Sequence, residues 1–511
     1  MIQRPAFLGA VLPLLSGVAL CLSFPNFSFF FLAWIGLVPY LHFLLQKPPW
    51  RLLLLGHLVM TTVYLGGIIY WIPEVLVLYG NLSWPAALGS YFLLLVVMSL
   101  FLAPFSLLVR GMEHRSLGGA LLCAPGFWVL TELCRNYYPD GFPWALLGYS
   151  QYPYGWIIQI ADLGGVYLVS LLVVAANCSL LAALRLRSPR PLFLFAFIFL
   201  GVNLYGSYCY SVWLQDSQPR IQTVLVQPNI NLSGNNEYYA EKYFEDLPKH
   251  YREAVEKGAD WVIFPEAPNP FFYREDFYFT TFWERQVAEL GAYLLFNTTS
   301  IEQDSSVRYF NSAILLGPKG QQTYRYDKQR LVPFGEYVPM EDWLGLIFEP
   351  VVQEVSQYSA GRSPQIGSLS QTPFATLICY EGIFPELSRH FVREGAQILV
   401  NITNDSWYGR SAAPRQHLEM SAFRAIENRR PLLRCANSGY SAVIDPLGRV
   451  TQQLGLFEEG VLEATISGIS ERSIYSRTGE WLNICIVIVT AFLAVGIWFR
   501  NSSSRSVKRG K

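Results

Sequence analysis

A cysteine at the end of a predicted buried strand is the first residue of this chain whose position suits catalysis. Cys379 follows the apolar run 373–378 and begins the segment CYEGIFPE. A thiol at a strand-to-helix turn is exposed at the edge of a sheet, as in a nucleophile elbow. The positive end of the following helix should lower the pKa of the Cys379 thiol and increase the fraction of thiolate. The sequence therefore predicts that Cys379 is a covalent nucleophile.

A nucleophilic thiol needs a base, and two charged residues at other strand ends are candidates. Histidine, the usual partner, occurs in this region outside the known cysteine–histidine signatures, at His250, His390 and His417. Glu266 follows the strand DWVIF within FPEA, and a partly buried carboxylate there can accept the thiol proton. Lys328 lies in YDKQRLVPFGEYVP, and an ammonium group near a thiolate also stabilises an oxyanion. A single Glu or Lys is usually a solvated surface charge, so the prediction rests on the shared placement of all three residues at strand ends.

Strands and helices alternate along residues 219–470, and this alternation predicts an α/β fold. Apolar runs predict buried strands at 221–227, 260–264, 292–297, 373–378 and 397–402. Amphipathic patterns predict helices at 238–257, 280–290 and 386–393, the first of which ends at Gly258. Two hairpins are expected, one from strand 311–316 through the turn 317–320 and one from strand 440–444 through the turn 445–448.

The charged residues are distributed unevenly, and this divides the chain. The 511 residues carry 38 basic and 38 acidic side chains, and a net charge of zero is not typical of a nucleic-acid-binding protein. Residues 1–213 hold 14 of these charges and the remainder hold 62. Eight apolar runs are long enough to cross a bilayer, at 6–24, 27–46, 53–73, 85–109, 117–134, 155–184, 191–213 and 482–499. We therefore expect a multi-pass α-helical membrane domain at 1–213, a soluble domain at 219–470, an eighth span at 482–499 and a basic tail at 500–511.

The basic residues favour one orientation in the membrane. With the N-terminus in the cytoplasm, the inside segments carry thirteen Lys and Arg residues, and the short outside loops carry Arg135 alone. By the positive-inside rule both termini are then cytoplasmic and the soluble domain lies outside the cytoplasm. The acidic residues of the apolar segments lie near span ends, which argues against a transporter or channel: Glu74, Glu132 and Asp162. Eight spans exceed what an anchor needs, so we expect the substrate to be in the membrane.

The segments around the three candidate residues resemble the signatures of a known family. FPEA at Glu266, YDKQRLVPFGEYVP at Lys328 and ICYEGIFPE at Cys379 are similar to the Glu-Lys-Cys motifs of the nitrilase superfamily, whose fold is a four-layer α-β-β-α sandwich. The flanking spans and four further segments narrow this resemblance to the apolipoprotein N-acyltransferase family of the bacterial inner membrane: NDSWYG at 404–409, GFPW at 141–144, GYSQ at 148–151 and RPLLRCANSGYSAVIDPLG at 430–448. One stretch departs from the family, because Tyr238 and Tyr239 occupy a region after the first strand where relatives can carry Trp.

The resemblance implies a ping-pong acyl transfer. Glu266 would activate Cys379, and its thiolate would attack the sn-1 ester of a phospholipid, for which we expect phosphatidylethanolamine. Lys328 and the backbone N–H that follows Cys379 would hold the oxyanion. The resulting thioester would pass its acyl chain to the α-amino group of an S-diacylglyceryl cysteine at a lipoprotein N-terminus. The resemblance also implies a periplasmic catalytic domain and no metal or organic cofactor.

Supporting residues are assigned by the same resemblance. Glu336 would orient Lys328 or Glu266. Three residues match family positions that line the pocket, with structural support as the alternative: Tyr380, Glu381 and Trp407. Cys435 is expected to be structural, and a disulfide between it and Cys379 is not expected. We also expect a monomer, because the soluble domain is held flat on a membrane.

Two apolar loops of the soluble domain predict contact with lipid. The segment after Glu336 contains Trp343 and Phe348, and the segment after Glu266 contains Phe271 and Phe272. Aromatic residues favour the membrane interface, so we expect these loops to enter the outer leaflet and to cover the acyl chain as a lid. The alternative is that they pack on the core of the domain.

Two other functions are compatible with these residues. A membrane-tethered carbon–nitrogen hydrolase, or amidase, would use the same triad with water as the acceptor, and it too would pass through a thioester. A receptor or scaffold with an inactive nitrilase fold would not need Glu266, Lys328 and Cys379, so their presence argues against that function. The membrane half and the apolar loops favour acyl transfer over hydrolysis.

Overall fold

The computed structural model describes residues 4–138, 141–213, 220–303, 307–337 and 358–509, and its internal contacts divide the chain into two units. The helical unit comprises Met1–Pro73, Ser83–Val212 and Thr478–Lys511. The sheet unit comprises Glu74–Leu82 and Trp213–Arg477.

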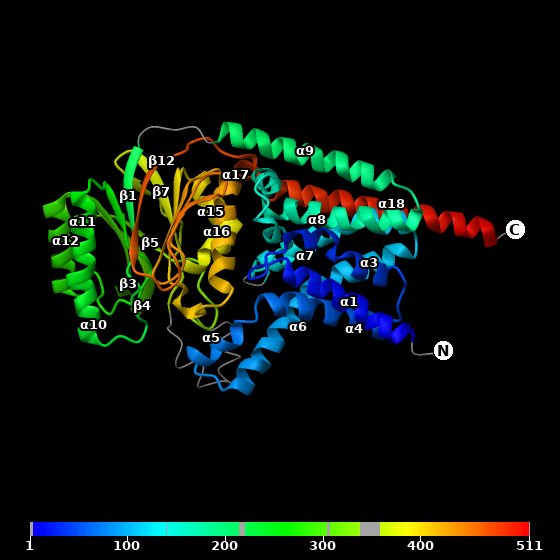
Figure 1. Ribbon diagram of the computed structural model, residues 1–511, viewed down its shortest axis with the longest axis horizontal. Coiled ribbons are helices and arrows are strands. Elements are labelled where there is room, and N and C mark those ends of the chain that lie inside the picture. The colour runs from blue at the N-terminus through cyan, green and yellow to red at the C-terminus, as the bar shows by residue number, and fades with distance from the viewer. Residues whose placement is uncertain (1–3, 139–140, 214–219, 304–306, 338–357, 510–511) are drawn as a thin grey trace. The chain divides into compact units, whose positions relative to one another are not determined.

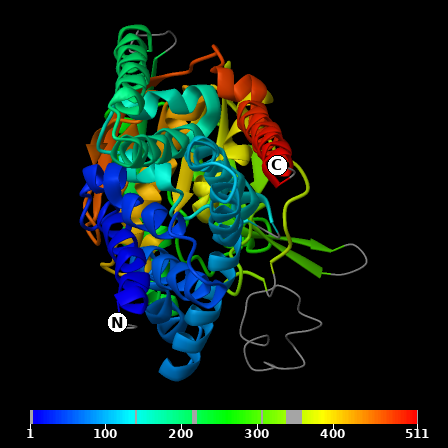
Figure 2. The same ribbon diagram turned by 90° about the vertical axis from the view of Figure 1, so that its right-hand side faces the viewer.

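The helical unit is a bundle whose longest members are α6 (Trp84–Glu113), α7 (Leu117–Tyr137), α8 (Ala161–Leu186), α9 (Arg190–Val212) and α18 (Trp481–Arg509). Shorter helices precede them: α1 (Arg4–Leu22), α2 (Ala33–Gly36), α3 (Val38–Leu44) and α4 (Trp50–Thr61). The residues of α5 (Ile72–Leu78) are divided between the two units after Pro73. Figures 1 and 2 both show α9 along the outside of this bundle.

Five helices in the described part of the chain are long and apolar enough to cross a membrane, at Trp84–Glu113, Leu117–Tyr137, Ile157–Leu186, Arg190–Val212 and Trp481–Arg500. Shorter apolar helices cover Gly9–Leu22, Phe30–Leu44 and Trp50–Gly66. Each of the eight predicted spans overlaps one of these segments, but the count of eight is not confirmed. The second predicted span, for example, is divided into η1 (Phe30–Leu32), α2 and α3, and no single one of these pieces is long enough to span a bilayer.

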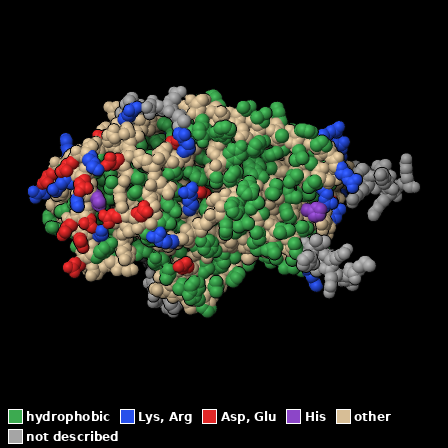
Figure 3. All heavy atoms as spheres, viewed as in Figure 1, with side chains coloured by type: hydrophobic (Ala, Val, Ile, Leu, Met, Phe, Trp, Pro, Cys, Tyr) green, Lys and Arg blue, Asp and Glu red, His purple; other side chains and the backbone are tan. Residues whose placement is uncertain are grey.

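Burial differs strongly among the long helices. Within the most apolar window of α8, 67% of the residues are buried inside the protein, whereas the corresponding share in α9 and in α18 is 11%. The outer helices therefore present apolar side chains outward, and Figure 3 shows hydrophobic side chains covering the visible surface of the helical unit. A continuous apolar surface of this kind is solvated by lipid rather than by water.

The sheet unit is built on two six-stranded sheets. The first has the order β12-β1-β2-β3-β4-β5, with β12 (Gly460–Ser467), β1 (Arg220–Gln227), β2 (Trp261–Ile263), β3 (Tyr293–Gln303), β4 (Val307–Leu316) and β5 (Gln322–Asp327). The second has the order β11-β10-β9-β8-β7-β6, with β11 (Val450–Gln453), β10 (Ala442–Ile444), β9 (Leu432–Ala436), β8 (Ile398–Thr403), β7 (Thr372–Ile378) and β6 (Gly367–Leu369). All five predicted strands and both predicted hairpins are confirmed.

Helices cover the outer face of each sheet and complete a four-layer α-β-β-α sandwich (Figure 1). The first sheet is covered by α10 (Asn236–Glu241), α11 (Leu247–Glu256) and α12 (Phe277–Leu290), and the second by α15 (Pro385–Arg393) and α16 (Ala413–Asn428). Alternate residues of β2 face opposite sides, as the pleat requires. Val262 belongs to the core under the helices with Trp283, while Trp261 lies 4.9 Å, between ring centroids, from Phe374 of the second sheet.

Helix α16 was not predicted from the sequence. Nearly all its residues are buried, including the polar ones, so it has no solvated face. A helix without a polar face lacks the apolar periodicity by which a sequence reveals a surface helix.

Candidate active site

The three candidate catalytic residues follow three different strands. Glu266 comes shortly after β2, Lys328 directly after β5, and Cys379 directly after β7. Strands β2 and β5 belong to the first sheet and β7 to the second. The site therefore lies where the two sheets of the sandwich face each other, and residues more than one hundred positions apart in the sequence contribute to it.

Two carboxylates flank the Lys328 ammonium group. The Lys328 Nζ lies 2.8 Å from Glu336 Oε1 and 3.7 Å from Glu266 Oε1. The lysine side chain is 1% exposed, and the glutamate side chains are 15% exposed for Glu266 and 13% for Glu336. A buried ammonium group needs such partners, because an unpaired charge away from water is costly.

Asn311 connects the two carboxylates and was not predicted from the sequence. Its Nδ2 donates to Glu266 Oε1 at 2.8 Å and to Glu336 Oε1 at 2.9 Å. Its own Oδ1 accepts a hydrogen bond of 2.7 Å from Asn297 Nδ2, and this fixes the orientation of the amide. Backbone N–H groups complete the cluster, from Asn404 to Glu266 Oε2 and from Val332 to Glu336 Oε2.

The environment keeps Lys328 charged. Burial by itself would lower the pKa of this ammonium group, but the carboxylates of Glu336 and Glu266 outweigh that effect and raise the pKa of Lys328 above its usual value of 10.5. Lys328 is therefore a permanent cation at neutral pH, which suits it to stabilise negative charge on a substrate oxygen.

Cys379 occupies a strained turn. It begins the short helix η6 (Cys379–Ile383) with φ of 50°, in the left-handed region that residues other than Gly rarely adopt, and it is 6% exposed. The predicted lowering of its pKa is wrong. Burial raises the pKa of the Cys379 thiol, the nearby Glu266 raises it further, and the opposing effect of Lys328 is smaller. A single turn of helix in a dry site does not offset desolvation, so the resting group is a thiol that needs a base.

Glu381 lies beneath the turn rather than in the pocket. Its Oε1 accepts hydrogen bonds from the hydroxyl of Tyr326 at 2.7 Å and from the backbone N–H groups of Gln329 at 2.7 Å and Arg330 at 3.1 Å. Its Oε2 accepts from the backbone N–H of Ile378 at 2.8 Å. With the side chain fully buried, these contacts correspond to the structural alternative that the sequence left open for Glu381.

The other two residues matched by the family pattern differ in exposure. Tyr380 is 6% exposed, and its ring meets the ring of Phe384 edge to face at 5.0 Å, which is a packing role. Trp407 is 42% exposed and meets the ring of Tyr79 edge to face at 4.7 Å. The Trp407 side chain is therefore partly packed against Tyr79 and partly exposed.

The predicted lid residues fall into two groups. Trp343 and Phe348 lie outside the described residues. Phe271 packs against Phe279 of α12, with ring centroids 5.6 Å apart in a stacked arrangement, and against the core under the helices. Phe271 therefore packs on the core of the domain, which was the alternative to the lid, although its side chain stays partly exposed. Phe272 is half-buried.

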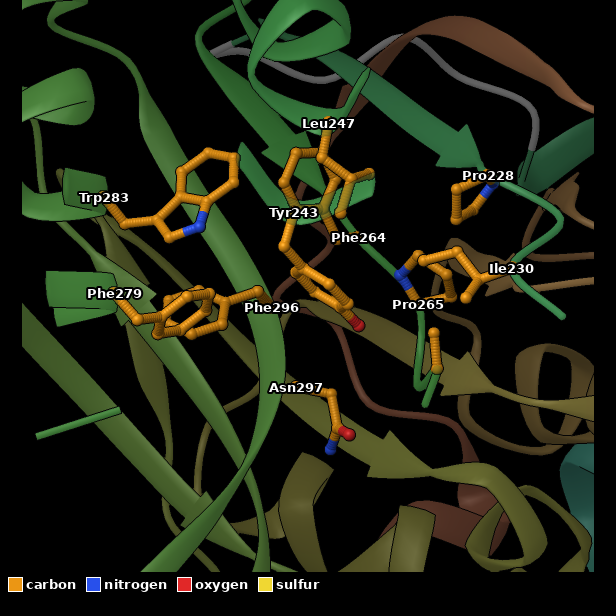
Figure 4. A pocket seen from close by; sticks show the side chains of 11 residues that line it. Pro228, Ile230, Tyr243, Leu247, Phe264, Pro265, Phe279, Trp283, Phe296 and Asn297 are labelled. Carbon is orange, nitrogen blue, oxygen red and sulfur yellow. The ribbon is translucent and has the colours of Figure 1, made fainter. Parts of the chain in front are cut away.

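An apolar pocket is lined mainly by aromatic and proline side chains (Figure 4). Its lining includes Phe264, Phe279, Trp283 and Asn297, together with Pro265 and Ala267, the sequence neighbours of Glu266. The cavity volume of about 10 Å³ is close to what one water molecule requires, so the pocket as it stands does not admit an acyl chain. Asn297 links this pocket to the site through its hydrogen bond to Asn311.

Cys435 lies between the sheets, away from Cys379. Its sulfur is 3.3 Å from the carbonyl oxygens of Val226 and Ile263, on β1 and β2 of the opposite sheet, and both cysteines are free thiols. This position agrees with the structural role expected for Cys435. Within the described ranges, no group of three or more His, Cys, Asp or Glu side chains could hold a metal ion.

A buried polar group beneath Cys379 was also missed. It consists of Asn401 on β8, Asp405 just after β8, His417 on α16 and Arg434 on β9, all fully or almost fully buried. The rule that placed Glu266, Lys328 and Cys379, a polar residue at the end of a strand, also holds for Asn404 and Asp405 after β8. Applying it there would have found this part of the group.

Comparisons with known proteins agree with both halves of the chain. The family model for the carbon–nitrogen hydrolase matches residues 224–472, and the model for the apolipoprotein N-acyltransferase N-terminal domain matches residues 16–179. The apolipoprotein N-acyltransferase of Geobacter metallireducens is 36% identical over 96% of this chain and 96% of its own length. The enzyme of the same name from Vibrio cholerae is 31% identical over 91% of this chain and 92% of its own, and that of Methylococcus capsulatus is 30% identical over 98% of each.

Proposed function

The chain belongs to the apolipoprotein N-acyltransferase family, and from this we propose that Cys379 carries an acyl chain from a membrane phospholipid to the α-amino group of a lipoprotein. The protein is a membrane-bound acyltransferase of the carbon–nitrogen hydrolase superfamily, and this reading is favoured over that of an amidase. The observation that supports Cys379, Glu266 and Lys328 as its catalytic residues is their meeting in one buried cluster: Lys328 Nζ lies 3.7 Å from Glu266 Oε1, and both charges act on the Cys379 thiol.

The first half-reaction forms a thioester. The Glu266 carboxylate accepts the proton of the Cys379 thiol as the sulfur attacks the sn-1 ester carbonyl of the phospholipid. Negative charge develops on the carbonyl oxygen of the ester, where the Lys328 ammonium and the backbone N–H of Tyr380 stabilise it. The carbon–oxygen bond then breaks, Glu266 returns the proton to the leaving alkoxide, and a lysophospholipid departs. Burial of the thiol explains why the proton must be removed during attack and not before.

The second half-reaction uses the same groups. The α-amino group of an S-diacylglyceryl cysteine attacks the thioester carbonyl, and Glu266 accepts a proton from the attacking nitrogen. The carbon–sulfur bond breaks, the thiolate recovers a proton from Glu266, and the amide product leaves. Glu336 and Asn311 touch no reacting atom in this scheme. They hold Lys328 and Glu266 in place through the contacts of 2.8 to 2.9 Å described above.

The proposal also includes the donor and the oligomeric state: the donor is phosphatidylethanolamine, and the enzyme is a monomer. It further includes the location of the protein in the bacterial inner membrane, with the sheet unit in the periplasm and both termini in the cytoplasm. The thirteen-to-one distribution of basic residues supports the orientation. Reporter fusions test it: a reporter that is active only in the periplasm should be active when fused after residue 470 and inactive when fused after residue 511.

Mass spectrometry of the acyl-enzyme tests the mechanism. The detergent-solubilised protein is incubated with phosphatidylethanolamine of one defined chain length, without lipopeptide, and the peptide that contains Cys379 is analysed before and after neutral hydroxylamine. We expect an acyl-sized adduct that hydroxylamine removes. The Cys379→Ala variant should carry none, whereas Cys435→Ala, which removes the other buried thiol of the sheet unit, should retain it.

The outcomes separate the alternatives. An unmodified Cys379 with intact lipid would exclude the phospholipid-donor mechanism. An adduct that water discharges as fast as a diacylglyceryl peptide does would favour a hydrolase. Replacing the donor by phosphatidylglycerol of the same chain length tests the preference for the headgroup alone. An equal rate of thioester formation with the two lipids would contradict the choice of phosphatidylethanolamine.

A further inference from the structure

The carbonyl of the nucleophile is held by two buried side chains. The oxygen of Cys379 accepts a hydrogen bond of 3.2 Å from Asn401 Nδ2, and His417 Nε2 lies 3.1 Å from the same oxygen. Both side chains are 0% exposed. A carbonyl oxygen has two lone pairs, so this pair of partners uses its full capacity.

The position of this carbonyl determines where the next N–H points. The Cys379–Tyr380 peptide bond is not among the cis bonds of the described residues, so it is trans. In a planar trans peptide the C=O and the N–H point in opposite directions. Because the carbonyl is directed toward Asn401 and His417, the N–H of Tyr380 is directed away from them. Cys379 adopts a strained φ of 50° in this arrangement, and such a conformation needs support from the surroundings.

The proton at His417 Nε2 is required by the geometry. The carbonyl of Cys379 is an acceptor, so Nε2 must be the donor, which excludes the neutral tautomer protonated at Nδ1. On the other side of the ring, Nδ1 lies 3.0 Å from Asp405 Oδ1 and 3.1 Å from the NH2 nitrogen of Arg434. That Arg434 nitrogen also donates to Asp405 Oδ2 at 2.6 Å. The ring of Tyr408 also meets the imidazole edge to face, with ring centroids 6.4 Å apart.

Burial and the neighbouring Arg434 favour the neutral form of His417. Burial and the adjacent guanidinium lower the pKa of His417, while Asp405 opposes them. In that form Nδ1 accepts a hydrogen bond from Arg434, and Nε2 carries the ring proton. The donor toward Cys379 is present in the imidazolium form as well, so the contact does not depend on the charge of the ring.

We propose that His417 is a positioning residue for acyl transfer: its Nε2–H holds the Cys379 carbonyl and so aims the Tyr380 N–H at the developing oxyanion. This inference rests on the proposed function, because it concerns the oxyanion of that reaction. It adds a residue that touches no substrate, and it gives a role to the buried group of Asp405 and Arg434. Those two side chains hold the imidazole ring through its Nδ1, which leaves Nε2 to donate to Cys379.

Two polar variants of His417 distinguish the contribution of the Nε2 proton from that of the rest of the side chain. In His417→Gln the side-chain amide nitrogen can take the place of Nε2 and still donate to Cys379. In His417→Asn the shorter amide takes the place of Nδ1, keeps its neighbours Asp405 and Arg434, and does not reach Cys379. Each protein is assayed at full length in detergent for the single-turnover rate of thioester formation from phosphatidylethanolamine, and for alkylation of Cys379 by iodoacetamide. Alkylation is a displacement at a saturated carbon and forms no oxyanion, so it reports on the nucleophile alone.

We expect His417→Asn to form the thioester about one hundredfold more slowly than the parent, as for loss of an oxyanion donor. Alkylation should change by less than about threefold, and His417→Gln should recover about tenfold of the lost rate. The proposal is overturned if His417→Asn forms the thioester at the parent rate. It is also overturned if thioester formation and alkylation fall together, because the histidine would then support the nucleophile or the fold. A parent protein that forms no thioester while iodoacetamide alkylates Cys379 would instead contradict the proposed function.

Discussion

The backbone N–H of Gln329 donates a hydrogen bond of 2.7 Å to the carboxylate of Glu381. The donor directly follows Lys328, and the acceptor lies two residues after Cys379. The same Glu381 side chain also accepts from the backbone N–H of Ile378, which precedes Cys379. One buried carboxylate thus connects the turn that carries the nucleophile with the loop that carries the ammonium group, and it sets the separation of two groups from different sheets.

Replacing this carboxylate should uncouple the two loops. In Glu381→Gln the amide can accept from the Lys328 loop but not also from Ile378, so one buried N–H loses its acceptor, at a cost of about 1–3 kcal/mol. We expect a lower thermal midpoint and at least about tenfold slower thioester formation, since small displacements of reacting groups are costly. Glu386→Gln is the matched control. Glu386 makes an ion pair with Arg330 of the same loop, at a side-chain exposure of 15%, and its loss should leave the thioester rate within about threefold. Equal rates in the two variants would contradict the coupling.

Asn311 should be essential for the alignment of the two carboxylates. In Asn311→Ala, Glu266 and Glu336 each lose a charge-assisted hydrogen bond, and we expect thioester formation to slow about 10- to 100-fold. Asn311→Asp should be slower still, because it places a third carboxylate against two others around one ammonium group. Single-turnover kinetics with phosphatidylethanolamine measure both. An aspartate variant more active than the alanine variant would mean that volume, not hydrogen bonding, is what this position needs.

Removing the Lys328 charge should affect both catalysis and stability. Lys328→Met leaves Glu266 and Glu336 as neighbouring buried carboxylates without a cation, so one of them should take up a proton. We expect thioester formation to fall at least about one hundredfold. The thermal midpoint of the variant should be lower at pH 8 than at pH 5, because the extra proton stabilises the folded state and is lost as the pH rises. Lys257→Met, at an exposed lysine paired with Glu463, is the control and should show neither effect.

Asp405 should contribute to resistance against acid. Burial would raise its pKa, but Arg434 and His417 lower the pKa of Asp405 from the usual 3.8 to about 2. A depressed carboxyl pKa stabilises the folded state above pH 3.8, and this contribution, about 2 kcal/mol, is lost as the pH falls through 2. In Asp405→Asn the loss of stability between pH 4 and pH 2 should therefore be shallower, with lower stability at neutral pH. Thermal midpoints across this range measure the slope. Asp445→Asn, at a carboxylate paired with Arg449 near the surface, should keep the parent slope.

Much of the architecture follows from local pattern. The strands 221–227, 260–264, 292–297, 373–378 and 397–402 and both hairpins are where the apolar runs and turn residues predict them, since a strand buried on both faces needs a continuous apolar sequence. Helix α16 escaped prediction because it is buried all round. The apolar composition of the membrane helices is likewise visible in the local sequence. The number of spans is not, because one apolar run is divided into the three short helices η1, α2 and α3.

The chain's own sequence determined which residues can do chemistry here. Glu266, Lys328 and Cys379 were identifiable because each side chain lies at or shortly after the end of a strand, and the motifs around them resemble one family. Only the tertiary structure decided how they act. Burial raises the pKa of the Cys379 thiol where the helix start predicted the reverse, since desolvation depends on everything packed around the sulfur. Asn311, Glu381 and His417 acquire their roles from partners that lie 25 to 55 positions away in the sequence, and a hydrogen bond at that separation exists only once the fold has brought the two elements together.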